Sequence, residues 1–116
     1  MSEAVDYKDL VFTTKHLGHV ATMVLSGAHS LGEVEGWLHG STIGPNDDQA
    51  TRLNFACDLL KEMDKSQGPE KTRDWFLGAY AKGHEASPVE AIREGYFEAV
   101  RAKVDRITKD SPLGDL

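Results

Sequence analysis

The chain has 116 residues, of which 40% are hydrophobic and 28% are charged, and this balance excludes an intrinsically disordered or collagen-like protein. No apolar run approaches the roughly 18 residues of a membrane span, and the N-terminus lacks the basic-then-apolar order of a secretion signal, so we expect a cytoplasmic protein without membrane contact. The formal net charge is −6, and residues 1–50 carry most of it, with Lys8 and Lys15 set against Glu3, Asp6, Asp9, Glu33, Glu35, Asp47 and Asp48.

Two helices are predicted in the acidic half. Residues 14–25 place an apolar side chain at every third or fourth position, and Thr13 or Thr14 is available as an N-cap. Ser26 and Gly27 end this helix, and residues 30–38 form a second one that stops at Gly40. Two short helices joined by a tight turn are a helix-turn-helix candidate.

The chemistry of the second helix argues against DNA as its partner. Its exposed positions are Gly32, Glu33, Glu35 and Gly36, with no Arg, Lys, Gln or Asn among them. Phosphate neutralisation and base reading both need such residues, and two carboxylates repel a polyanion. If DNA is bound, Ser30 can touch a phosphate and Glu33 lies at the interface. We instead expect a scaffold for packing or for a homodimer.

The rest of the chain is also predicted to be helical. The longest helix spans residues 47–65 and buries one apolar stripe, made of Leu53, Ala56, Leu59, Leu60 and Met63. Cys57 lies on the same face and is expected to be a small core residue. Pro69 opens a further helix through Trp75 and Phe76. In no segment do apolar and polar residues alternate with the period of two that is typical of a β-strand, so the sequence predicts an all-α protein.

Catalytic and metal-binding patterns are weak. His16 and His19 are three residues apart, which suits two metal ligands, but a site needs three or four convergent groups. Neither Cys57 nor Ser26 has the surroundings of a nucleophile elbow. Asp47 and Asp48 stand where acids favour a helix N-terminus. We therefore expect no enzyme activity, no metal and no cofactor.

The last third of the chain carries the most specific pattern. Ser87 can accept hydrogen bonds from the first turn of a helix, Pro88 fits its first position, and Glu90 completes a capping box. Gly95 ends this short helix. A closing helix then presents an apolar stripe, formed by Phe97, Val100, Val104 and Ile107.

This arrangement resembles the small C-terminal toxin-binding domain of the Xre/MbcA/ParS antitoxin family. That family's pattern runs from a Trp through a loop to a Pro, a short apolar helix, a Gly and a Val-bearing helix. The residues of this chain at matching positions are Trp75, Pro88, Ile92, Gly95, Val100 and Ile107. The resemblance covers about residues 70–108 and extends more weakly over residues 30–69. The loop departs from the family, with Ala79-Tyr80 and Lys82-Gly83 where the family carries Pro-Asn and then Leu.

The resemblance implies a noncatalytic protein that docks on a RES-type toxin consuming NAD and blocks its active-site entrance. Residues 1–66 would form the helix-turn-helix-like bundle, residues 67–110 the partner-binding subdomain, and residues 111–116 a tail that orders on binding. We expect the partner-binding residues to be Tyr80, His84, Arg93, Leu113 and Leu116, with Trp75, Pro88 and Gly95 building the motif.

Two alternatives remain open at this point. A DNA-binding regulator or phage-type repressor would use the helix-turn-helix. A phage or host interaction protein would keep the fold without a toxin partner, as the altered loop around Ala79 and Gly83 suggests.

Overall fold

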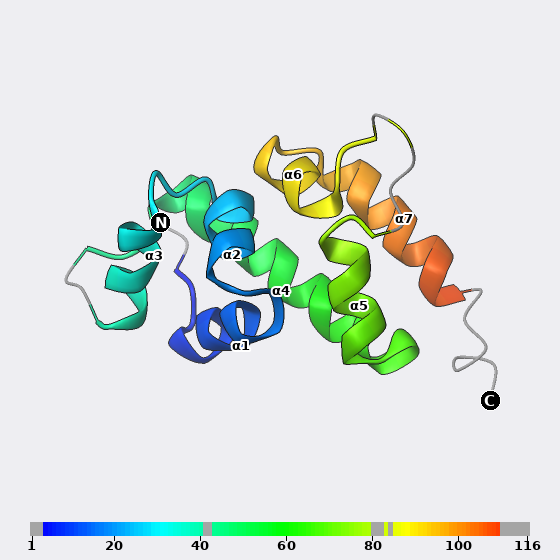
Figure 1. Ribbon diagram of the computed structural model, residues 1–116, viewed down its shortest axis with the longest axis horizontal. Coiled ribbons are helices and arrows are strands. Elements are labelled where there is room, and N and C mark those ends of the chain that lie inside the picture. The colour runs from blue at the N-terminus through cyan, green and yellow to red at the C-terminus, as the bar shows by residue number, and fades with distance from the viewer. Residues whose placement is uncertain (1–3, 41–42, 80–82, 84, 110–116) are drawn as a thin grey trace.

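The computed structural model describes residues 4–40, 43–79, 83 and 85–109 of the chain (Figure 1). These residues form seven helices and no strand, which confirms the all-α prediction. The helices are α1 (Tyr7–Leu17), α2 (His19–Ser26), α3 (Leu31–Leu38), α4 (Asp47–Gln67), α5 (Pro69–Phe76), α6 (Pro88–Arg93) and α7 (Phe97–Lys109).

Helix α4 is the central element. It packs against α1 and α2 near one end of the molecule and against α5 and α7 near the other, as the green helix of Figure 1 shows. The two groups of helices also meet directly, because α6 packs against α2. The short α6 is thereby fixed from two sides, by α2 and by α7.

The core follows the predicted apolar stripe of α4. The five stripe residues are each 0–1% exposed, and Cys57 is buried among them. The same cluster takes in Leu25 of α2, Phe76 of α5, Ile92 of α6 and Val104 of α7, all of them fully buried. Hydrophobic burial on this scale is the main stabilising term of a small helical protein. The core is continuous across residue 66, the predicted boundary between the N-terminal bundle and the C-terminal subdomain.

The prediction of one helix over residues 14–25 was wrong. Two helices cover this region, because Gly18 adopts a φ of +95° and breaks the chain between α1 and α2. The true start lies at Asp6, whose side chain accepts a hydrogen bond from the Lys8 backbone N–H at 2.9 Å. Thr13 and Thr14 are buried residues of α1 and cap nothing. The predicted ends of the other helices agree with the structure to within about two residues.

The part of the chain that the structure describes contains no helix with the length and apolar character needed to cross a membrane.

Candidate partner-binding site

Local hydrogen bonds fix α6, the short helix of the C-terminal motif. The Ser87 hydroxyl accepts a hydrogen bond from the Glu90 N–H, and the Glu90 carboxylate accepts one from the Ser87 N–H, each at 3.2 Å. Pro88 occupies the first turn. The predicted capping box is confirmed. Its hydrogen bonds from Ser87 lower the pKa of the Glu90 carboxyl below the usual range.

The end of α6 is equally well defined. Gly95 has a φ of +84°, its N–H donates to the Ile92 carbonyl, and the Tyr96 N–H donates to the Ala91 carbonyl, both at 3.0 Å. This is the Schellman arrangement that a glycine stop produces. Between cap and stop, Val89 and Ile92 are buried in the core. Pro88 is therefore held at a fixed place on the surface.

Trp75 lies at the boundary between the core and the surface. Its ring makes an edge-to-face contact with Phe76, with 5.0 Å between the ring centroids. Phe76 is fully buried, whereas Trp75 is only partly buried and packs against the core from outside. Part of Trp75 therefore remains accessible to solvent.

Two adjoining hollows meet at Trp75 and Ile107, and we call them together the Trp75 cleft. The first has a volume of about 190 Å³ and the second about 300 Å³. The first lies among α5, α6 and α7 and is lined by Trp75, Glu85, Ala86, Pro88, Lys103, Arg106 and Ile107. The second lies among α4, α5 and α7 and is lined by Met63, Gln67, Lys71, Trp75 and Ile107.

An ion-pair network holds α7 against α4 beside this cleft. The Arg101 guanidinium donates to both oxygens of Glu62, at 2.5 and 2.8 Å, and to Asp105 at 2.6 Å. These contacts lower the pKa of Glu62 and raise that of Arg101. Within the first hollow, Lys103 pairs with Glu85 from the loop before α6.

The predicted partner-binding residues fall in different places. Arg93 is exposed at the end of α6 and does not line the Trp75 cleft. The other four residues, Tyr80, His84, Leu113 and Leu116, lie outside the described residues. Of the motif residues, Trp75 and Pro88 line the cleft together, and Gly95 shapes α6 from its far end.

The residues considered for DNA contact serve the local structure of α3. The Ser30 hydroxyl accepts a hydrogen bond from the Glu33 N–H at 3.2 Å, which caps the helix. The Glu33 carboxylate accepts one bond from the His29 N–H at 2.9 Å and another from the Gln49 side chain at 2.8 Å. The hydrogen bond from His29 contributes most to lowering the pKa of Glu33, and the hydrogen bond from Gln49 lowers it further. Both polar groups are thus committed within the chain.

Three histidines, His16, His19 and His39, pair with carboxylates, and His16 and His19 have different partners. His16 lies 2.8 Å from Asp64 of α4. His19 and His39 both approach the Glu35 carboxylate, at 3.1 and 3.2 Å. The described residues contain no group of three or more His, Cys, Asp or Glu side chains that is arranged to hold a metal ion.

Sequence reasoning missed the basic residues of the cleft, Lys71, Lys103 and Arg106. On their own helices they look like ordinary solvated side chains. The sequence pointed to them only indirectly, because all three lie on the two helices that carry Trp75 and Ile107 of the motif.

Comparison of the chain with protein-family models, with curated proteins and with solved structures found no match in any of the three.

Proposed function

We propose that the chain is a noncatalytic protein-binding protein of the antitoxin type, which neutralises a RES-type toxin that consumes NAD. The observation that carries this proposal is the Trp75 cleft. Trp75, Pro88 and Ile107, three residues on which the resemblance to the Xre/MbcA/ParS family rests, are far apart in the sequence and line the same hollow.

The remaining residues of the motif support the same proposal through their structural roles. Ile92 and Val100 are buried and anchor α6 and α7 to the core. Gly95 supplies the positive φ that separates these two helices. The motif therefore acts as a unit that presents the cleft, which is what a docking surface requires: rigid support below and accessible apolar side chains above.

DNA binding is the weaker alternative. Helix α3 contains no Lys or Arg, and its accessible side chains include Leu31 and Glu35. Ser30 and Glu33 already form hydrogen bonds within the chain, so few of their hydrogen-bonding positions remain for a nucleic acid. A duplex would meet an acidic surface.

The test has two steps: a search of the neighbouring genes for a RES-domain protein, which the proposal expects there, and co-expression of that protein with the chain in a bacterial host. We expect the full chain to restore growth and the cellular NAD level. By the resemblance, a variant truncated after Lys109 retains binding to the toxin but loses protection, since it lacks the segment proposed to block the active site. Failure of the full chain to restore growth, with both proteins expressed in soluble form, would overturn the proposal.

A further inference from the structure

The charge of the Trp75 cleft differs in sign from that of the whole chain. The lining side chains comprise three cations, Lys71, Lys103 and Arg106, and one acid, Glu85, whereas the chain as a whole carries a formal charge of −6. Lys103 and Glu85 pair with each other. Within the described residues, Lys71 and Arg106 have no ion-pair partner, so two positive charges face solvent at this cleft.

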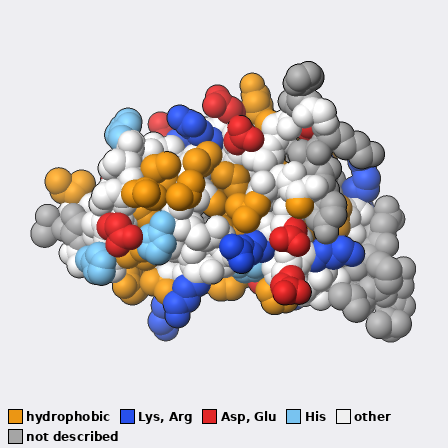
Figure 2. Space-filling model, viewed as in Figure 1, with side chains coloured by type: hydrophobic (Ala, Val, Ile, Leu, Met, Phe, Trp, Pro, Cys, Tyr) orange, Lys and Arg blue, Asp and Glu red, His pale blue; other side chains and the backbone are white. Residues whose placement is uncertain are grey.

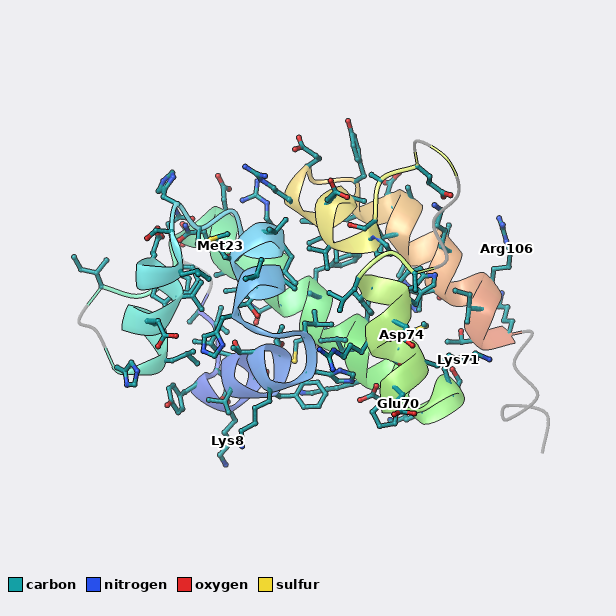
Figure 3. The ribbon with its side chains drawn as sticks, viewed as in Figure 1. Lys8, Met23, Glu70, Lys71, Asp74 and Arg106 are labelled. Carbon is teal, nitrogen blue, oxygen red and sulfur yellow. The ribbon has the colours of Figure 1, made fainter. Side chains whose placement is uncertain are left out.

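The two cations flank an apolar floor. Met63 is buried at the base of the larger hollow, and Trp75 and Ile107 are partly buried along its walls. Figure 3 shows Lys71 on α5 and Arg106 on α7 at the same end of the molecule. A volume of about 300 Å³ is at the lower limit of binding pockets, and it suits one or two inserted side chains better than a large ligand.

We infer that the Trp75 cleft binds an acidic, extended segment of the partner protein. A large aliphatic side chain of that segment enters the hollow between Met63, Trp75 and Ile107, and flanking carboxylates meet Lys71 and Arg106. The apolar contact supplies affinity, and the charges select the segment and orient it. This inference deepens the proposed function and rests on it in assigning the cleft to a protein partner.

The acidic residues next to the cleft determine from which side a carboxylate can approach it. Glu70 and Asp74 lie beside Lys71 on α5 (Figure 3) and line a separate hollow with it. Figure 2 shows acidic and basic side chains close to one another on the right half of this face. Glu70 and Asp74 would repel a carboxylate that approaches over α5. The acidic groups of the bound segment are therefore expected to reach Lys71 from the α7 side of the cleft, where Arg106 lies.

The experiment is an NMR titration of the full-length, ¹⁵N-labelled chain with synthetic peptides. The probe is an acetylated and amidated ten-residue peptide of sequence GSDELLDESG. Two comparison peptides replace its acids by bases (GSKRLLKRSG) or its leucines by alanines (GSDEAADESG). The chain has two indole N–H signals, and that of Trp37, buried in α3, serves as the internal control for Trp75.

We expect the acidic leucine peptide to shift the Trp75 indole signal in a saturable way, to leave the Trp37 signal unchanged, and to bind at least about tenfold more tightly than either comparison peptide. The double variant Lys71→Glu/Arg106→Glu should lose this binding and gain affinity for the basic peptide. Lys8→Glu on α1, distant from the cleft in Figure 3, is the matched control and should bind as the unmodified chain does.

Two results would overturn the inference: no shift of the Trp75 signal by the acidic peptide, or equal binding of the acidic and basic peptides. If the cleft fails this test but the chain still restores growth beside the toxin, docking occurs elsewhere and the proposed function stands. If the cleft binds the acidic peptide but the chain gives no protection, the site stands and its partner is another protein.

Discussion

Replacing Ile92 by alanine tests whether α6 is held in place by its burial. Ile92 is 0% exposed and belongs to the core cluster that joins α6 to α2 and α4. The substitution removes three carbon atoms, and at about 0.8 kcal/mol for each buried methylene the loss of transfer free energy is about 2.4 kcal/mol. The cavity left behind raises the expected loss in unfolding free energy to about 3–4 kcal/mol.

Equilibrium urea denaturation, followed by far-ultraviolet circular dichroism, measures this loss. Ile92→Val removes one methylene group and should cost about 1 kcal/mol, and Arg93→Ala, at the exposed neighbouring position, should cost less than about 0.5 kcal/mol. A loss below about 1 kcal/mol for Ile92→Ala, or equal losses for Ile92→Ala and Arg93→Ala, would refute the packing described for α6.

Three further predictions concern the glycine stop, an ion pair and the thiol. Gly95→Ala should lower the free energy of unfolding by about 1–2 kcal/mol in the same urea assay, because the φ of Gly95 is +84°. No atom lies within 4 Å of an added Cβ, so the expected loss comes from the backbone conformation alone. A loss near zero would show that the backbone relaxes. Glu62→Gln should cost about 0.5–1 kcal/mol at pH 7, since the pair with Arg101 is partly exposed. Arg101 lowers the pKa of Glu62 in the folded state, so the ionised carboxylate stabilises the fold above its ordinary pKa of about 4.3. The difference in unfolding free energy between the unmodified chain and Glu62→Gln should therefore shrink as the pH falls through the pKa of folded Glu62. A difference that does not depend on pH would contradict this ion pair. Cys57 is 1% exposed, and burial raises the pKa of its thiol. A disulfide reagent should therefore label Cys57 on the order of 1,000-fold more slowly in the native chain than in the urea-unfolded chain. Equal labelling rates would show that Cys57 lies at the surface.

The features that sequence reasoning predicted well are governed by local rules. The apolar stripe of α4, from Leu53 to Met63, repeats over about three turns, which leaves one face for the core. The Ser87 and Glu90 cap, the Pro88 start and the Gly95 stop of α6 each depend on residues within five positions of one another. Such short-range constraints are visible in the sequence because their partners are adjacent.

The start of α1 shows where such reasoning fails. The apolar period of α2 continues backward through Leu17, so the sequence pattern predicts one helix that runs through Gly18. The structure instead uses its positive φ to redirect the chain, and the cap lies at Asp6, outside the strongly periodic region. Two polar threonines, Thr13 and Thr14, are buried by tertiary packing that no local pattern reveals.

The Trp75 cleft could be predicted only in part. The motif singled out Trp75, Pro88 and Ile107, but their convergence depends on how α5, α6 and α7 pack on α4. The second hollow brings Met63 together with Ile107, across more than 40 residues of sequence. Lys71 and Arg106 become significant only once these helices are adjacent. The partner roles of Tyr80, His84, Arg93, Leu113 and Leu116 stay predictions.

Docking on a RES-type toxin can be measured by isothermal titration of the purified chain with the purified RES-domain protein that the proposal expects to be encoded beside its gene. We expect a stable complex, with binding at least about tenfold weaker for Lys71→Glu/Arg106→Glu and unchanged for Lys8→Glu. Absence of binding by the unmodified chain would contradict the proposal that the chain docks on a RES-type toxin. Binding that the double variant leaves unchanged would contradict the role of the Trp75 cleft.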